Sequence, residues 1–445
     1  MNDLIEARVL KGFRDYPPQL EIRRQLLVEK LQSVFRAFGF IPIDTPALEY
    51  TEVLLRKSDG ETEKQVFRFT DNGGRDVALR FDLTVPLARF IAEHQNEISY
   101  PFKRYHIANV WRGEKPQAGR FREFKQCDFD IVGADSAESD FEIINVIAES
   151  FLAMNISNIK IHISHRGLFN RLLEKLGVGD KSEAVLRTVD KLSRVGKAEV
   201  RRLLGELCPV NTITDIMQFI CAGNAATGDS LSFLETLNVL ETMIGGHCEE
   251  SERLKKVYTL LQAVDKADFV LLDPSITRGL DYYTGIVYET LLTDLPAIGS
   301  VCSGGRFNNL TGLYMKETVP GVGASIGLDR LLAAIDELGY FNTAISFTKA
   351  LIFYTDHVSS VTQYLLANFL SKAGIATEVF SEHKKMSAQY SWAEQKGIPF
   401  GIFIKTNVEN EHDLNTVEVQ LKDLRTREQK TLILADVPME IMKNP

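Results

Sequence analysis

The pattern of apolar residues predicts a helix and then a strand near the start of the chain. Between residues 22 and 38, apolar side chains return every three or four positions, which is typical of an amphipathic helix. Gly39 follows and is a common helix stop. The next residues, 40–44, predict a strand that runs into Pro46.

Alternating apolar and polar positions predict an antiparallel sheet over residues 65–130. Residues 66–69 and 77–81 flank a turn sequence, Asp-Asn-Gly-Gly, which is a good hairpin signal. Further on, two extended runs lie on either side of a loop that contains Gly113, Pro116 and Gly119. These runs predict a second, longer hairpin over residues 104–133.

The pattern changes twice more along the chain. Residues 168–257 are helical in character and contain polar, lysine- and arginine-rich segments such as 180–204, which indicates an insertion between core segments 1–167 and 258–342. Strands at 269–272 and 286–292, a glycine-rich stretch and a helix at 328–338 complete the core. Strand-like segments at 351–353, 377–380 and 400–404 then alternate with helices, which predicts a separate α/β domain over 348–445. The predicted fold class is α+β, an antiparallel-sheet core with a helical insertion plus a C-terminal α/β domain.

Composition and charge narrow the class of protein. The chain has 445 residues, 44% hydrophobic and 25% charged, which predicts a folded protein of several domains. Its net charge of −9 argues against general coating of DNA, although residues 103–125 contain seven Lys or Arg against two Glu. No apolar run is long enough to span a bilayer, and the first residues do not resemble a signal peptide. We therefore expect a cytoplasmic protein that binds no membrane and no DNA.

Several familiar sites are absent from the sequence. The five scattered cysteines form no C-x-x-C pair, so we expect free thiols rather than a zinc site, disulfides or a catalytic cysteine. There is no phosphate-binding P-loop and no H-E-x-x-H motif. The glycines of residues 321–327 come too late for a dinucleotide fingerprint. His162 and His165 should point to opposite faces of a strand, so we interpret them as structural.

The long hairpin carries the most informative chemistry. If both arms are regular strands, Arg112 shares a face with His106 and Val110. The matching face of the return arm holds Arg120, Arg122, Phe124, Gln126 and Asp130. Cations and an aromatic ring suit a phosphate and a purine, while the amide and carboxylate suit an ammonium group. The alternative is a solvated hairpin whose charges face water.

Three other segments add candidate binding residues. Arg80, Asp82 and Thr84 alternate and are expected to share a strand face, where Asp82 either anchors an ammonium group or pairs with Arg80. Arg278 precedes the adjacent tyrosines Tyr282 and Tyr283, of which one is expected to line a pocket. Arg330 lies at a predicted helix start, where the helix dipole also attracts anions.

Together these segments resemble the class II aminoacyl-tRNA synthetases, and specifically the histidyl-tRNA synthetase family, over essentially the whole chain. Residues 11–15 are similar to the N-terminal signature, and the helix and strand reaching Pro46 resemble class II motif 1, which builds a dimer interface. Residues 104–130 resemble motif 2, and 321–332 resemble motif 3. The segments Arg-Gly-Leu-Asp-Tyr-Tyr at 278–283 and Ser-Gly-Gly-Arg at 303–306 match the two histidine-specific motifs.

The resemblance implies a ligase that activates L-histidine with ATP and Mg²⁺ and transfers it to the 3′ end of tRNA(His). It implies a homodimer and an anticodon-binding role for residues 348–445. It also implies a role for each matching residue. ATP would be bound by Arg112, Glu114, Arg120, Phe124 and Arg330; histidine by Asp82, Thr84, Gln126, Asp130, Tyr282 and Tyr283; Arg278 and Arg112 would be catalytic. No metal ligand is assigned.

Departures and rival interpretations remain open at this point. Phe307 and Asn308 stand where the family commonly has tyrosine and aspartate, and Asp82 is one methylene shorter than the glutamate of many bacterial members. A regulatory subunit of ATP phosphoribosyltransferase would share the core but lack the last domain. A pure RNA-binding module would need the loss of arginines that are present here.

Overall fold

The computed structural model describes residues 4–55, 63–115, 119–223, 231–277, 283–339, 346–408, 410, 414 and 416–443. They form two compact units, whose main parts are residues 26–341 and 342–445. No helix among the described residues is long and apolar enough to cross a membrane.

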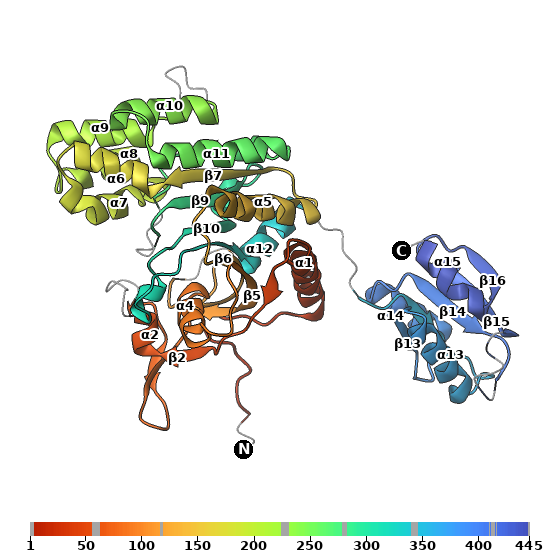
Figure 1. The fold of residues 1–445 in the computed structure, drawn as a ribbon. Coiled ribbons are helices and arrows are strands. Elements are labelled where there is room, and N and C mark those ends of the chain that lie inside the picture. The colour runs from red at the N-terminus through yellow and green to blue at the C-terminus, as the bar shows by residue number, and fades with distance from the viewer. Residues whose placement is uncertain are drawn as a thin grey trace. The chain divides into compact units, whose positions relative to one another are not determined.

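An eight-stranded sheet forms the centre of the first unit (Figure 1). Its strand order is β1-β5-β6-β11-β10-β9-β7-β8, antiparallel from β5 to β7 and parallel at the two outer pairs. The strands are β1 (Ile41–Pro42), β5 (Phe102–Trp111), β6 (Glu123–Val132), β7 (Ile159–His165), β8 (Val270–Leu272), β9 (Ile286–Leu292), β10 (Cys302–Arg306) and β11 (Gly321–Gly327). This confirms the expected antiparallel core and the long hairpin.

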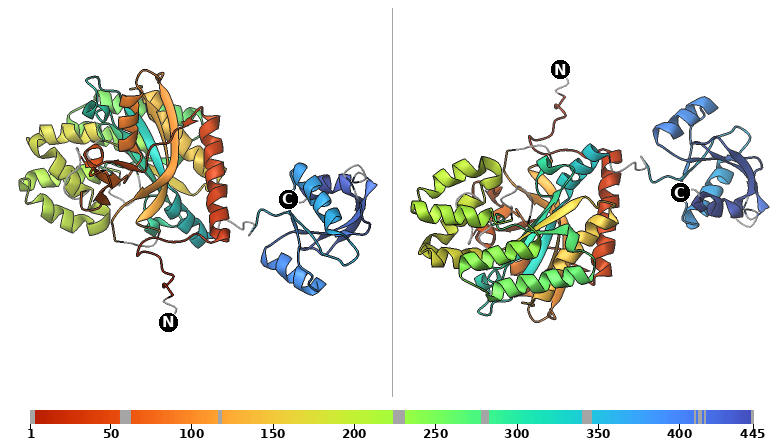
Figure 2. Two further views of the ribbon diagram at one scale, coloured as in Figure 1. Left: turned by 90° about the horizontal axis from the view of Figure 1, so that it is seen from below. Right: turned by 90° about the horizontal axis from the view of Figure 1, so that it is seen from above.

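Apolar side chains on one face of this sheet pack against helices. Phe129 of β6 lies 4.8 Å, between ring centroids, from Phe35 in the second half of α1 (Pro18–Ala37). Helices α5 (Ala137–Ala153) and α12 (Leu328–Leu338) also pack on this side. Figure 2 shows α1 lying alongside the sheet in both of its views. Burying this face leaves the alternate side chains of each strand on the other face.

The expected hairpin at 66–81 forms, but it belongs to a separate three-stranded sheet. That sheet has the order β2-β4-β3, and its strands are β2 (Leu48–Tyr50), β3 (Arg68–Thr70) and β4 (Asp76–Leu79). Helices α2 (Thr51–Leu55) and α4 (Thr84–Glu93) accompany it. The prediction of one continuous sheet over residues 65–130 was therefore wrong, because α4 interrupts it.

The segment between β7 and β8 is helical, as its polar pattern predicts. It contains α6 (Arg166–Lys175), α7 (Ser182–Val189), α8 (Leu192–Leu204), α9 (Val210–Ile220), α10 (Phe233–Ile244) and α11 (Glu249–Ala263). These helices gather at the β7 end of the sheet (Figure 1). Short 3₁₀ turns lie at Gly179–Lys181, Ala267–Phe269, Pro296–Ile298, Thr311–Leu313 and Leu434–Asp436.

The second unit has its own sheet and core. The sheet order is β13-β12-β14-β15-β16, parallel over the first three strands and antiparallel after them. Its strands are β12 (Ala350–Ile352), β13 (Thr377–Val379), β14 (Phe400–Ile404), β15 (Glu418–Asp423) and β16 (Gln429–Ile433), with helices α13 (Ser360–Lys372), α14 (Met386–Gln395) and α15 (Val437–Lys443). The three predicted strands and the α/β character are confirmed, while β15 and β16 were not predicted.

Candidate active site

The face of the large sheet opposite α1, α5 and α12 carries a row of buried polar side chains. Across the β5–β6 pair, Arg104 lies opposite Asp130, His106 opposite Asp128, and Ala108 opposite Gln126. Because these pairs are two residues apart along each strand, their side chains share one face. The polar members of the row are all buried.

Three buried carboxyl groups meet at this row. Burial raises the pKa of Asp82 to about 6, of Asp128 to about 6 and of Asp130 to about 7, and neighbouring carboxylates also raise the pKa values of Asp82 and Asp130. Arg104 opposes this, with its Nη2 2.7 Å from Asp130 Oδ2 and both side chains at most 4% exposed. Together the groups form a buried acidic cluster, in which a cationic ligand would favour the ionised carboxylates.

The same cluster contains hydrogen-bond acceptors that lack donors. Among the described residues, the buried atoms Asp82 Oδ2, Gln126 Oε1 and Asp128 Oδ1 have no hydrogen-bond partner. Gln126 donates from Nε2 to Ser325 Oγ at 2.8 Å, so its amide oxygen is left for another donor. Buried acceptors in folded proteins are normally satisfied, so this cluster is suited to a ligand rich in N–H groups.

Three arginines gather at the other end of the hairpin. The pKa of Arg330 falls to about 10 because its guanidinium is buried and lies near the cations of Arg120 and Arg112. Arg330 donates to Ser300 O at 2.5 Å, and Arg112 donates to Phe81 O at 2.9 Å. These bonds hold repelling cations together, which is the arrangement expected of a site for a multiply charged anion.

An aromatic ring and a carboxylate lie beside these cations. The Arg112 guanidinium lies 5.2 Å from the centroid of the Phe124 ring. Glu114 Oε2 lies 3.8 Å from Arg120 Nη1. A flat ring next to guanidinium groups provides a stacking surface for a base attached to a phosphate chain.

Residues near the N-terminus brace the hairpin. Arg14 pairs with Asp329 at 2.9 Å, and the second oxygen of Asp329 accepts from Lys125 N at 2.7 Å. Arg122 donates to the carbonyls of Glu114 and Lys11, at 3.2 and 3.3 Å. Arg122 was predicted to join the site face, but these backbone contacts instead attach it to the N-terminal segment.

Asp82 lies in the site, but it precedes a helix and is not on the predicted strand. Strand β4 ends at Leu79, and Thr84 already begins α4, so the expected strand through Arg80, Asp82 and Thr84 was wrong. The Asp82 carboxylate accepts from Val85 N at 3.1 Å, which stabilises the helix start. Arg80 donates to Thr45 O and Asn109 O rather than to Asp82, which leaves the carboxyl group beside Asp128.

Glycines allow other side chains to lie against the sheet. A Cβ on Gly323 would lie 1.9 Å from Asp130 Oδ1, and one on Gly305 would lie 2.8 Å from Cδ1 of the buried Tyr283. Both positions therefore require glycine for close approach. The neighbouring Arg278 and Tyr282 lie outside the described residues.

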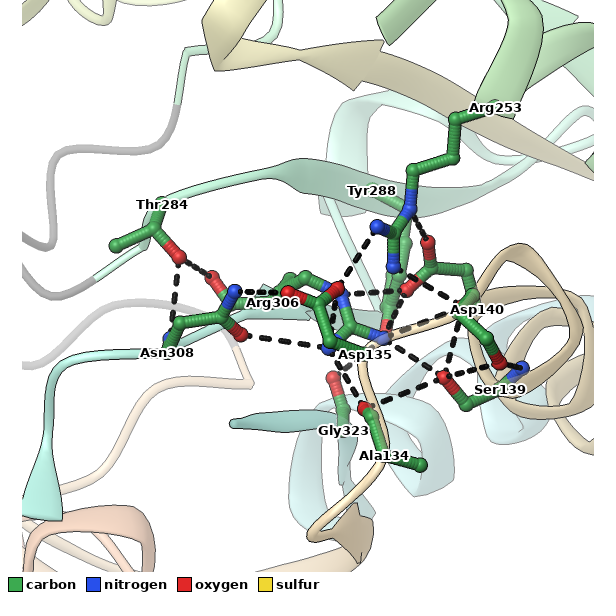
Figure 3. Close-up of polar contacts among 11 residues, drawn as sticks. Ala134, Asp135, Ser139, Asp140, Arg253, Thr284, Tyr288, Arg306, Asn308 and Gly323 are labelled. Carbon is green, nitrogen blue, oxygen red and sulfur yellow. Dashed lines mark hydrogen bonds and ion pairs between the residues drawn. The ribbon is translucent and has the colours of Figure 1, made fainter. Parts of the chain in front are cut away.

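The arginine of the 303–306 segment lies on the opposite face of the sheet, because it pairs with Val322, next to Gly323 along β11. Figure 3 shows its polar contacts. Arg306 donates from Nε and Nη2 to Asp140 Oδ1, at 2.9 and 2.7 Å. The next residue, Phe307, packs in an apolar cluster with Phe102 and Leu310. The Phe307 ring therefore lies in an apolar environment that suits a side chain without a hydroxyl.

Sequence reasoning missed three residues of the pocket. Arg104, Asp128 and Ser325 all lie on the polar face, with Ser325 directly opposite Asp128 across β6–β11. The signal was available, because Asp128 lies between Gln126 and Asp130 in the same alternation. Arg104 likewise alternates with His106.

Sequence comparison now identifies the family. The histidyl-tRNA synthetase family profile matches residues 12–331, and an anticodon-binding domain profile matches 356–444. The chain belongs to the histidyl-tRNA synthetase family. The predicted family, the fold class and the ligase activity that uses ATP are thereby confirmed.

Relatives of this family match over almost the whole chain. A histidine–tRNA ligase of Treponema denticola is 54% identical over 444 residues, which cover 99% of each chain. A crystal structure of histidyl-tRNA synthetase from Nostoc sp. has a TM-score of 0.81 at 28% identity and covers 99% of this chain and 100% of that one. A Bacillus halodurans structure, titled as an ATP phosphoribosyltransferase regulatory subunit/histidyl-tRNA synthetase, shares the fold at a TM-score of 0.71 and 20% identity, covering 88% of this chain and 97% of that one.

Proposed function

We propose that histidyl-adenylate forms on the polar face of the large sheet. In this step a carboxylate oxygen of histidine attacks the α-phosphorus of ATP, and pyrophosphate leaves. The terminal ribose hydroxyl of tRNA(His) then attacks the adenylate carbonyl, which releases AMP. Neither step needs a nucleophile from the protein, so the chain acts by positioning reactants and stabilising charge.

The observation that supports this proposal is the opposite character of the two ends of the site. Buried carboxyl groups and unsatisfied acceptors occupy one end, around Asp82, Gln126 and Asp130. Guanidinium groups occupy the other, around Arg112 and Arg330. An ammonium group and a triphosphate bound at these ends would bring a carboxylate towards a phosphorus atom.

At the acidic end we assign histidine. Asp82, Thr84 and Gln126 would bind its ammonium group, because Asp82 and Gln126 have unsatisfied acceptor atoms. Asp130 would bind the imidazole together with Tyr283, and Tyr282 remains proposed for the same pocket. Arg104 pairs with Asp130 and would keep its carboxylate oriented.

At the basic end we assign ATP. Arg112, Arg120 and Arg330 would neutralise the phosphates, while Phe124 would stack on adenine and Glu114 would accept from its amino group. Arg278 is proposed to contact the α-phosphate and the histidine carboxylate. No group of three or more His, Cys, Asp or Glu side chains among the described residues is arranged to hold a metal ion. We propose that Mg²⁺ enters with ATP. When bound there, Mg²⁺ would neutralise phosphate charge.

We also propose roles for the remaining surfaces. Residues 356–444 match the anticodon-binding profile, which supports binding of tRNA(His) by the second unit. Exposed apolar side chains at the β1 edge and on the small sheet support a homodimer. These are Ile41, Leu48, Tyr50 and Phe69.

The proposal is tested by exchange of labelled pyrophosphate into ATP without tRNA. We expect exchange that depends on L-histidine and that is absent with the other nineteen amino acids. A second test is the Arg330→Met variant. It removes one proposed phosphate-binding cation and should lower exchange by at least about tenfold. If the parent protein shows no histidine-dependent exchange, this proposal is wrong.

A further inference from the structure

Both ends of the helical insertion are linked to the segment that carries Tyr283, one directly and the other through intermediate residues. Arg166 opens α6, the first insertion helix, and its backbone N–H donates to Gly285 O at 3.0 Å. The Arg166 side chain donates from Nη1 to Tyr283 O at 2.7 Å. The insertion therefore holds the backbone of residues 283–285 directly at its beginning.

The other end of the insertion reaches the same segment through an ion network (Figure 3). Arg253 of α11 donates to Asp140 Oδ2 at 2.5 Å, and its Nη1 lies 2.7 Å from Asp135 Oδ1. Arg306 binds the other Asp140 oxygen and lies 3.4 Å from Asp135 Oδ1. The two arginines thus share both carboxylates, so the position of one constrains the position of the other.

Arg306 in turn contacts the residues that follow Tyr283, so a shift of Arg306 would shift them too. Thr284 N donates to Arg306 O at 2.8 Å, and a Cβ on Gly285 would lie 3.1 Å from Arg306 Cδ. Thr284 Oγ1 also accepts from Asn308 N at 3.1 Å, and Asn308 donates to Asp135 at 2.9 Å. Besides the Arg166 contacts, the segment is therefore fixed by backbone and side-chain contacts to Arg306 and Asn308, which belong to or touch this network.

The centre of the network is buried, whereas Asp135 at its edge is 44% exposed. The side chains of Asp140, Arg306 and Arg253 are 0%, 2% and 18% exposed. Water cannot replace a lost partner of the buried Asp140, so removing Arg253 is expected to shift Asp140 and Arg306. By contrast, Lys256 and Glu138 join the same two helices with side chains that are 57% and 55% exposed.

We infer that Arg253 is a positioning residue for the histidine pocket, acting through Asp140 and Arg306 on the segment that holds Tyr283. The inference rests on the proposed function, because it takes Tyr283 to line the histidine site. It gives the insertion a role in the chemistry of the core, in addition to any contact with RNA. The expected signature is a change in histidine binding without a change in ATP binding.

The Arg253→Met variant tests this inference. Arg306 still neutralises Asp140 in this variant, and Asp135 is partly exposed, so the fold is expected to persist. In histidine-dependent pyrophosphate exchange, the KM for histidine should rise roughly tenfold while the KM for ATP stays within about twofold. Arg253→Lys, which keeps the charge, should recover part of the loss.

The control variant is Lys256→Met, which removes the exposed ion pair on the same helix and should change neither KM. Thermal unfolding of each variant shows whether the assays are made on folded protein. An unchanged KM for histidine in Arg253→Met, or equal rises in both KM values, would overturn the inference. Absence of exchange in the parent protein would instead reject the proposed function, so the two failures are distinguishable.

Discussion

Asp82 is an ionisable group held in full burial, and burial raises its pKa from 3.8 to about 6. A carboxyl group whose pKa is higher in the folded state holds its proton more tightly there. Folding is therefore penalised where the unfolded chain is ionised, progressively from about pH 4 and fully above pH 6. Above pH 6 the protein without ligand is therefore less stable, because its site contains a buried carboxyl group that is suited to binding a cation.

Replacing Asp82 by asparagine should remove this penalty. The asparagine oxygen still accepts from Val85 N, so the start of α4 is kept. We expect the free energy of unfolding of Asp82→Asn to exceed that of the parent by about 1–3 kcal/mol at pH 7.5, with the difference vanishing near pH 4. Urea denaturation at several pH values measures it. The same variant should raise the KM for histidine.

The turn residue Asp71 provides a control of opposite sign. A side-chain hydrogen bond from Arg75 lowers the pKa of Asp71, so its charged form stabilises the fold at neutral pH. Asp71→Asn should therefore lower stability at pH 7.5, and the loss should disappear in acid. If both variants shift stability in the same direction, the account of the buried carboxyl group is contradicted.

At the scale of elements, the close contact of β11 with β6 depends on one glycine. A Cβ on Gly323 would lie 1.9 Å from Asp130 Oδ1 and 2.8 Å from Phe129 O. Gly323→Ala must therefore displace the Asp130 side chain or separate the strands. We expect a loss of about 1–3 kcal/mol in stability and a large rise in the KM for histidine, measured by urea unfolding and pyrophosphate exchange.

Gly312→Ala is the matched control, because the nearest atom to its Cβ would be Thr318 Cγ2 at 3.7 Å, an ordinary contact. This variant should keep both stability and the KM for histidine. Normal histidine binding in Gly323→Ala would show that Asp130 does not need its present position.

Elements bounded by strong local signals could be predicted from the sequence. Strands β9 and β14 and helix α12 have the predicted bounds, because apolar patterns and flanking turn residues agree there. β15 and β16 were missed, although they form a local hairpin. β16 is mostly exposed and lacks an alternation of buried and exposed positions, so its sequence carries little strand signal.

In the candidate site, too, local patterns could be predicted from the sequence and tertiary contacts could not. Alternation placed Gln126 and Asp130 on one face, but it could not show that Asp82 turns into a helix start, because a carboxylate bound to Val85 N is a tertiary detail. The pairing of Arg104 with Asp130 depends on strand register, which sequence alone leaves open.

At the scale of the whole molecule, two units with separate hydrophobic cores divide the expected work. The second unit buries its own apolar cluster, which includes Ile352, Leu366 and Ile402. Its removal should leave the sheet that carries Asp130 and Arg330 intact. Adenylate formation and tRNA recognition are therefore expected to be separable.

A chain that ends at residue 346 tests this separation. Histidine-dependent pyrophosphate exchange should stay within about twofold of the full chain, whereas kcat/KM for charging tRNA(His) should fall at least about a hundredfold, since each stacked base contributes roughly 1–3 kcal/mol. An RNA that contains only the acceptor stem is the control, because both proteins should charge it equally. Equal losses in exchange and in charging would mean that the second unit supports the catalytic sheet itself, and the division of work would then be wrong.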